Sequence, residues 1–209
     1  MGESPTVFVV DDDPSLQAGL DSLLRSAGYR SSVFASGHDF LDALDPEAHG
    51  CALLDVRMRE MDGLQVQTRL IESKIALPVI FLTGFGDVPM TVTAVKKGAV
   101  DFLLKPFREH ELLAAVARAI DQDRTQRADA RELKALRETY ASLTKRERQV
   151  MNLVCRGLLN KQVADQLQIS EVMVKVHRGH AMQKMGTKNL PHLVRLADRL
   201  AAAEGTHSD

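Results

Sequence analysis

The chain has 209 residues, of which 44% are apolar, so it is long enough for two domains that each bury a core. No apolar run approaches a membrane span, and no charged segment followed by an apolar one opens the chain, so we expect a cytoplasmic protein. The net charge of −1 hides an asymmetry, because residues 142–209 carry 11 Lys and Arg against 6 Asp and Glu, whereas residues 1–141 carry 16 against 22. A basic C-terminal part suggests a polyanionic partner, although chance variation in charge is the alternative explanation.

Residues 1–120 alternate short apolar runs with segments of helical periodicity. Each apolar run is typical of a buried parallel strand, and a helical segment separates each run from the next. Strict alternation of this kind predicts an α/β domain built on a doubly wound, five-stranded parallel sheet. The predicted strands span residues 6–10, 31–34, 51–55, 78–83 and 100–104, and the predicted helices span 15–27, 38–44, 64–72, 88–97 and 108–120.

Two helix starts and both cysteines can be interpreted from local patterns. Asp13 precedes Pro14 and is expected to open the first helix, and Ser36 is a candidate cap for the second. Cys51 and Cys155 lie in apolar patterns in different halves of the chain. We therefore expect two reduced thiols in two cores rather than a disulfide or a redox pair.

Residues 121–141 contain no Gly or Pro, and the first part of this stretch has no large apolar side chain. This composition predicts a continuous, partly exposed helix that links two domains, residues 1–120 and residues 142–209. A coiled coil is an alternative for this helix, but its apolar stripe is short.

The domain over residues 142–209 has the pattern of four short helices. Thr144 and Glu147 have the spacing of a capping box before the first helix, and Ser170 is expected to cap the third. A tight turn joins the second and third helices, which predicts an all-α helix-turn-helix domain. The predicted helices span residues 145–156, 160–167, 171–185 and 189–202.

Polar side chains close four of the predicted strands. Asp11 and Asp12 follow the first strand, Asp55 ends the third, Thr83 ends the fourth, and Lys105 follows the fifth. Since an open α/β sheet keeps its ligand site at the carboxyl ends of its strands, we expect these side chains at one edge. Carboxylates suit Mg²⁺, which prefers oxygen ligands, and Asp55 is placed to attack phosphorus while Lys105 contacts the phosphoryl oxygens. Three carboxylates packed together also predict a bound cation and at least one perturbed pKa.

Four segments carry a resemblance to a known family over residues 5–120. They resemble the receiver domain of two-component response regulators, which has a CheY/flavodoxin-like fold. One position departs from the family pattern, because Arg59 stands where the family usually has proline after Met58, and this affects the shape of the loop rather than the chemistry. The segments are Val-Val-Asp11-Asp12-Asp13, Leu-Leu-Asp55-Val-Arg57-Met58 with Met61-Asp-Gly63, Thr83-Gly-Phe-Gly-Asp87-Val-Pro-Met90, and Asp101-Phe102-Leu-Leu-Lys105-Pro106-Phe107.

The resemblance assigns a role to each residue of the site. It implies that Asp55 is the phosphorylated residue and that Lys105, followed by a cis peptide bond to Pro106, is the phosphoryl contact. It makes Thr83 and Phe102 the switch pair. It also implies Mg²⁺, for which Mn²⁺ or Ca²⁺ can substitute, with four ligands: Asp11, Asp12, Asp55 and the backbone carbonyl of Arg57.

The third helix of the C-terminal domain, residues 171–185, has the composition of a recognition helix. A helix-turn-helix lays this helix in the major groove, where cationic side chains meet phosphates or bases and an apolar one can meet a thymine methyl group. Asn160 and Lys161 open the preceding helix, where they suit phosphate contacts. A solvated surface is the alternative role for each cationic residue taken singly. We expect four apolar residues of these helices in the core instead, namely Val163, Leu167, Val172 and Val174.

Three further segments look like the LuxR/NarL-type helix-turn-helix over residues 142–202, and with the receiver the whole chain resembles the FixJ branch. They are Leu143-Thr144-Lys-Arg146-Glu147-Arg-Gln-Val150, Arg156-Gly157-Leu-Leu-Asn160-Lys161-Gln-Val-Ala164, and Val174-Lys175-Val176-His177-Arg178. Relatives often carry a larger polar residue at the position of Gly179. The expected DNA-binding residues are Asn160, Lys161, Met173, Lys175, Val176, His177, Arg178 and Gly179.

The last predicted helix has two interpretations. Its leucines, Leu193, Leu196 and Leu200, resemble the dimer contact that the family uses on DNA. Packing within the C-terminal domain is the alternative.

Together the two resemblances imply a phosphorylation-dependent transcriptional regulator. A sensor histidine kinase would phosphorylate Asp55, after which the chain would form a homodimer and bind double-stranded promoter DNA, with RNA polymerase as a candidate further partner and no membrane partner. The resemblance implies no enzyme activity beyond self-phosphorylation and slow self-dephosphorylation.

Two other functions are weighed against this one. A haloacid-dehalogenase-type phosphatase also uses a strand-end Asp with Mg²⁺, but it needs a second Asp two residues later, where this chain has Arg57. Turnover of small phosphate esters would favour that alternative. A constitutive DNA-binding protein whose receiver only binds other proteins would show DNA affinity that ignores phosphorylation, and the intact set of Asp12, Asp55 and Lys105 argues against it.

Overall fold

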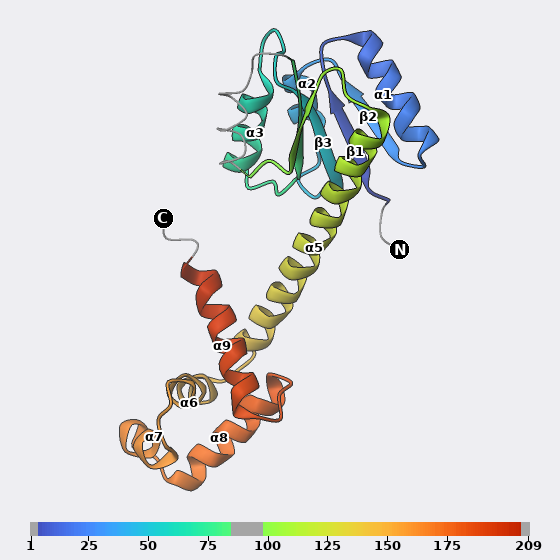
Figure 1. Cartoon of the computed structure of the whole chain (residues 1–209). Helices are drawn as coiled ribbons and strands as arrows, with labels where there is room; N and C mark the ends of the chain where they lie inside the picture. Colours follow the sequence, from blue (N-terminus) through green and yellow to red (C-terminus); the bar gives the residue numbers. More distant parts are fainter. Residues whose placement is uncertain (1–3, 85–97, 206–209) are drawn as a thin grey trace. The chain divides into compact units, whose positions relative to one another are not determined.

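The computed structural model describes residues 4–84 and 98–205, and the predicted helix over residues 88–97 lies outside these ranges. The chain divides into two compact units, Met1–Arg127 and Ala128–Asp209 (Figure 1). Within the described ranges, no helix combines the length and the apolar character that crossing a membrane requires.

The first unit is built on a parallel five-stranded sheet with the strand order β2-β1-β3-β4-β5, which confirms the predicted fold class. All five predicted strands are present, and each boundary lies within one residue of its prediction. The strands are β1 (Thr6–Val10), β2 (Arg30–Phe34), β3 (Gly50–Asp55), β4 (Val79–Thr83) and β5 (Asp101–Leu104).

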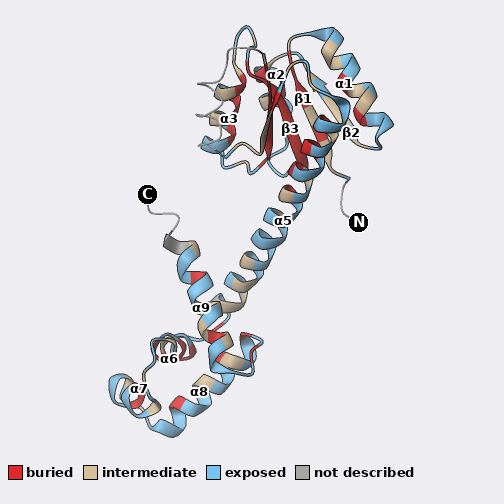
Figure 2. Ribbon diagram, viewed as in Figure 1, coloured by how far each residue is buried: buried red, intermediate tan, exposed pale blue. Residues whose placement is uncertain are grey.

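Each face of the sheet has its own core, because alternate side chains of a strand point to opposite faces. On one face, residues such as Val9 and Leu53 pack against α1 (Pro14–Ser26) and α5 (Glu109–Ala141). On the other face, residues such as Leu54 pack against α2 (Gly37–Ala43) and α3 (Gly63–Glu72). Every residue of β3 and β4 is buried, as Figure 2 shows for β3 in red, which explains why their sequences are apolar almost throughout.

Short polar side chains begin the first two helices, as predicted. The carboxylate of Asp13 accepts a hydrogen bond from the backbone N–H of Ser15 at 2.8 Å and caps α1. The hydroxyl of Ser36 accepts from the backbone N–H of Asp39 at 3.1 Å and caps α2. At the end of α1, Gly28 has a φ of +85°, a conformation that favours glycine and stops the helix.

Helix α5 is one continuous helix of 33 residues, which confirms the predicted linker helix. Its first turns bury Leu112 and Val116 in the core of the first unit. Its last turns place Leu136 and Tyr140 against the core of the second unit.

The second unit contains the four predicted helices around one core. Thr144 and Glu147 form the predicted capping box, and the hydroxyl of Ser170 accepts from the backbone N–H of Met173 at 3.2 Å. Between the second and third helices Gln168 has a φ of +53°, which makes the turn tight. The helices are α6 (Lys145–Cys155), α7 (Asn160–Leu167), α8 (Glu171–Lys184) and α9 (Leu190–Gly205).

Candidate functional site

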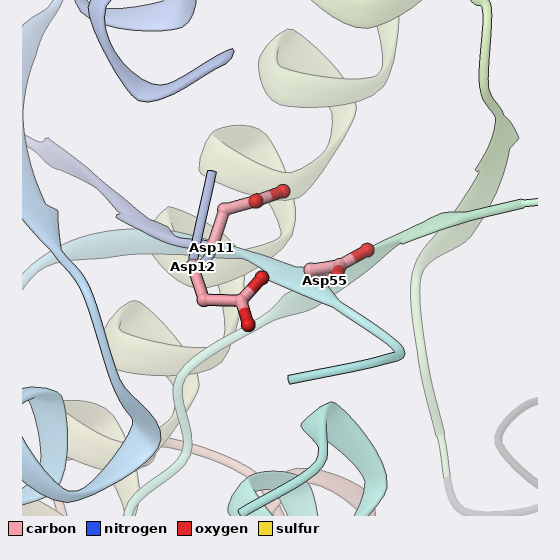
Figure 3. A group of neighbouring side chains, drawn as sticks. All are labelled: Asp11, Asp12 and Asp55. Atoms are coloured by element: carbon pink, nitrogen blue, oxygen red, sulfur yellow. The ribbon is translucent and has the colours of Figure 1, made fainter. Parts of the chain in front are cut away.

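Three carboxylates meet at the carboxyl edge of the sheet, as predicted from the strand ends. The pairing of Val10 with Leu54 places the ends of β1 and β3 side by side, so that Asp11, Asp12 and Asp55 converge. One oxygen of each lies within 4.8 Å of the others, and Figure 3 shows the three side chains around a common space. Asp11 and Asp55 are 1% and 7% exposed, so their charges need a compensating cation.

Lys105 supplies a positive charge to this cluster from the chain that follows β5. Its Nζ donates to Oδ2 of Asp11 at 2.7 Å and to Oδ1 of Asp55 at 2.8 Å. The peptide bond from Lys105 to Pro106 is cis, as the resemblance implied. The ammonium group therefore bridges the two most buried carboxylates.

The ionisation of the site shows the competition between burial and pairing. Burial raises the pKa of the Asp55 carboxyl above its usual range, although the hydrogen bond from Lys105 opposes the shift. Burial alone would lower the pKa of Lys105, but the hydrogen bonds to Asp11 and Asp55 outweigh it and raise that pKa. The predicted perturbed pKa is thus present at Asp55.

The donor set fits a hard divalent cation. Three carboxylates from two adjacent strand ends offer only oxygen ligands, as Mg²⁺ prefers. Such an ion would lie among Asp11, Asp12 and Asp55, beside the ammonium of Lys105. The carbonyl of Arg57 as a further ligand stays a prediction.

The predicted switch residues lie on β4, which pairs with β3, and on β5, which pairs with the far side of β4. Thr83 ends β4 and is 1% exposed, and its hydroxyl donates to the carbonyl of Gly84 at 3.3 Å. Phe102 on β5 stacks on Phe81 of β4, with ring centroids 5.2 Å apart and an interplanar angle of 18°. Their movement on phosphorylation stays a prediction.

The chain between β3 and the first residue of α3 contains a close approach that only glycine allows. A Cβ built on Gly63 would lie 2.4 Å from the carbonyl oxygen of Asp55, so a side chain there would displace the strand end that carries the carboxylate. In the same loop, Nε of Arg59 lies 3.6 Å from Oδ2 of Asp12, although the Arg59 side chain is 90% exposed. The residue that departs from the family pattern thus places a cation beside a candidate metal ligand.

Most predicted DNA-binding residues lie on exposed parts of α7 and α8. Arg178 and Asn160 prove to be partners, since Nη1 of Arg178 donates to Oδ1 of Asn160 at 3.2 Å and ties the two helices together. His177, Arg178 and Asn160 are half-buried. The exposed members of the predicted set are Lys161, Met173, Lys175, Val176 and Gly179.

One core prediction for these helices is wrong. Val163 and Val174 are buried and Leu167 packs against the core, but Val172 is 67% exposed. Two residues along a helix turn through about 200°, so Val172 faces away from the side that buries Val174. The missed signal was therefore helical phase, and Val172 joins the exposed surface of α8.

The leucines of α9 pack inside the second unit. Leu193 and Leu200 are 0% and 7% exposed, and Leu196 packs against the same core. Of the two interpretations for these side chains, the structure thus supports packing within the domain.

Glu147, a buried carboxylate that joins α6 to α8, has a partner beyond the capping box that its sequence predicts. Oε2 of Glu147 accepts from the backbone N–H of Thr144 at 2.8 Å, as the capping box requires, and also from Nζ of Lys184 at 2.7 Å. The hydrogen bond from Lys184, followed by that from Thr144, lowers the pKa of Glu147 to about 2. The spacing of the box identified the cap, but Lys184 lies 37 residues away in sequence, on α8.

Comparison with known proteins decides the family. Residues 7–117 match the response regulator receiver domain, and residues 141–197 match the bacterial regulatory proteins of the luxR family. The chain belongs to the response regulators. It is a two-component regulator with a receiver and a LuxR-type DNA-binding domain, and its similar proteins are transcriptional regulators.

Relatives of this response regulator match along nearly the whole chain. The response regulator TodT of Pseudomonas putida is 48% identical over 194 residues, which are 93% of this chain and 86% of the relative. The transcriptional regulatory protein FixJ of Bradyrhizobium diazoefficiens is 40% identical over 193 residues, 92% of this chain and 94% of the relative. The solved structure of the response regulator StyR superposes with a TM-score of 0.81 at 45% identity, over 94% of this chain and 99% of that one.

Proposed function

We propose that phosphorylation of Asp55 by a sensor histidine kinase switches this regulator into a form that dimerises and binds promoter DNA. The single observation that carries the proposal is the bridge of Lys105 between Asp11 and Asp55, beside Asp12. That arrangement places an acceptor carboxylate, an ammonium group and two further carboxylates suited to a divalent cation within one small space. It matches what an in-line phosphoryl transfer needs, which is positioning and charge stabilisation.

In this mechanism an oxygen of Asp55 forms a bond to phosphorus as the P–N bond of the kinase phosphohistidine breaks, and the imidazole leaves with the bonding electron pair. Asp55 is held for this step by the end of β3 and by the close packing of Gly63 behind it. Lys105, already donating to Asp55, keeps its ammonium against the phosphoryl oxygens. Asp11, Asp12 and Asp55 would hold Mg²⁺, which would supply the remaining positive charge for those oxygens.

After transfer, the two switch residues respond to the new group. The hydroxyl of Thr83 would turn from Gly84 to a phosphoryl oxygen, and Phe102 would repack against its neighbours on β4 and β5. The added charge then shifts the equilibrium between two packing arrangements of these side chains, and this shift is how a phosphorylation switch works. The exposed residues of α8, foremost Lys175 and Val176, would contact the bases of the DNA.

The test measures DNA affinity and oligomeric mass for wild type and Asp55→Asn, with and without acetyl phosphate and Mg²⁺. The DNA probe is a duplex selected from a randomised pool with the treated wild-type protein. Asp42→Asn is the matched control, because Asp42 is an exposed aspartate of α2 in the same unit. We expect wild type and Asp42→Asn to gain mass and affinity and Asp55→Asn to show neither change. An equal response of Asp55→Asn would refute Asp55 as the acceptor, and equal DNA binding by every sample would favour the constitutive alternative.

A further inference from the structure

A further buried carboxylate lies at the opposite edge of the sheet from the acceptor. Asp123 on α5 is 3% exposed, although its neighbours in sequence are polar residues typical of a solvated helix. A buried carboxylate is costly unless charges and hydrogen bonds compensate it, so its partners show what the site is for.

The partners of Asp123 come from α5 itself and from the chain that enters β3. Oδ1 accepts from Nε of Arg127, one turn later, at 2.8 Å, and Oδ2 accepts from the backbone N–H of Gly50 at 3.1 Å. Nδ1 of His49 lies 3.9 Å from Oδ2. Arg127 in turn donates from Nη2 to the carbonyl of Ala48. We call Asp123, Arg127 and the backbone groups of Ala48 and Gly50 the α5 clamp.

The backbone conformation at Gly50 is tightly constrained. Gly50 has a φ of +132°, and a Cβ there would lie 1.8 Å from the carbonyl oxygen of Thr6. A side chain is therefore excluded, and the backbone N–H of Gly50 meets Asp123. The clamp consequently fixes the first residue of β3, the strand whose last residue is Asp55.

The position of the clamp on α5 is as informative as its contacts. The first compact unit ends at Arg127, the last residue of the clamp, while α5 continues without a break to Ala141. Beyond Arg127 the helix packs with the DNA-binding unit through Leu136 and Tyr140. Asp123 and Arg127 are thus the last described polar anchor of α5 within the receiver unit.

We infer that the α5 clamp couples the phosphorylated receiver to the DNA-binding unit, with Asp123 and Arg127 as positioning residues that hold the linker helix to the start of the acceptor strand. The inference rests on the proposed function, since it concerns how phosphorylation of Asp55 reaches the DNA. Loss of the clamp leaves the acceptor site at the other edge of the sheet intact and removes the polar hold of the linker helix on the start of β3, while the apolar packing of the first turns of α5 remains.

The test uses the full chain with Asp123→Asn and Arg127→Met combined, which removes both charges at nearly constant volume. The matched control combines Asp121→Asn and Arg124→Met, because these exposed residues have the same types on the same helix outside the clamp. Arg127→Gln alone is the second variant, since it leaves Asp123 its bond from Gly50 and is the milder change. Three quantities are compared: phosphorylation of Asp55 by acetyl phosphate from intact mass, hydrogen exchange of residues 120–130 and 48–50, and the ratio of DNA affinities with and without phosphorylation.

We expect the clamp variant to be phosphorylated at a rate within about twofold of wild type, to exchange faster at residues 120–130, and to lose roughly three- to thirtyfold in the affinity ratio. Arg127→Gln should change the exchange rate and the affinity ratio in the same direction but by less, and the control should match wild type in both. A folded clamp variant that keeps the wild-type affinity ratio overturns the coupling, even where exchange is faster, because the clamp is then only structural. Wild type without any response to phosphorylation would instead show that the proposed function fails, and the coupling with it.

Discussion

Replacing Glu147 by glutamine should weaken the DNA-binding unit in a manner that depends on pH. The side chain is 5% exposed, and its carboxylate accepts from Lys184 and from the backbone of Thr144. Glutamine keeps an oxygen for Thr144 but loses the charge that holds Lys184 against α6. The substitution therefore separates the ion pair from the helix cap.

The magnitude follows from the pKa of Glu147, which falls from 4.5 to about 2. A shift of this size corresponds to roughly 3 kcal/mol of stabilisation at neutral pH as an upper limit. The loss in Glu147→Gln should be smaller, about 1–2 kcal/mol, because the cap survives and solvent screens part of the ion pair. Lys184 is 39% exposed, which accounts for that screening.

The sign of the pH dependence follows from the depressed pKa. The stabilising contribution is complete above pH 4.5, where the unfolded chain is also ionised, and it is lost as the pH falls toward about 2. The difference in unfolding free energy between wild type and Glu147→Gln should therefore shrink by about half between pH 7 and pH 3.

Tyrosine fluorescence can follow the DNA-binding unit alone. The chain has two tyrosines and no tryptophan, so in a Tyr29→Phe background Tyr140 is the sole reporter during urea unfolding. A difference between wild type and Glu147→Gln that stays constant from pH 7 to pH 3 would refute the reasoning. A difference that shrinks equally for Glu171→Gln, an exposed glutamate on α8, would show a general charge effect instead.

Three further substitutions have defined outcomes. Arg59→Gln should raise the affinity for Mg²⁺ by roughly two- to fivefold in calorimetric titration, because it removes the cation 3.6 Å from Asp12, while Arg69→Gln, the control in an exposed ion pair of α3, should not. Leu159→Ser should stabilise the DNA-binding unit by about 0.5–1 kcal/mol in urea, since Leu159 occupies the N-cap position of α7 without a side-chain cap hydrogen bond and is 71% exposed. Gly179→Ala should add about 1 kcal/mol by helix propensity, since open space surrounds it, and weaken DNA binding in a titration with the selected duplex. If Gly179→Ala increased the stability of the unit without changing its DNA affinity, the predicted contact at Gly179 would be contradicted.

The convergence of the carboxylates at the sheet edge was predictable because its signals are local. An apolar run followed by Asp11 or Asp55 marks a strand and its carboxyl end, and parallel topology then brings the ends together. Helix caps such as Asp13 were predictable for the same reason, since the donor and acceptor lie within a few residues.

The residues that sequence reasoning missed have partners far along the chain. Asp123 lies in a polar stretch that suggests exposure, and it is buried because residues 48–50, more than 70 positions earlier, fold over it. Lys184 binds Glu147 across 37 residues, and the local sequence around neither residue indicates this pair. Val172 and Val174 differ only in helical phase, which the packing of α8 decides. Long-range pairing of polar groups and the choice of the buried helix face thus require the tertiary structure.

The packing of the end of α5 has a practical consequence for recombining regulators. A chimera that joined a foreign receiver at residue 142 would discard Leu136 and Tyr140 from the core of the DNA-binding unit. It would also remove Glu132, whose carboxylate pairs with Arg199 of α9 at 3.0 Å. A junction at residue 128 keeps these contacts and falls where the second compact unit begins. The natural unit of exchange in this protein therefore carries its own stretch of linker helix.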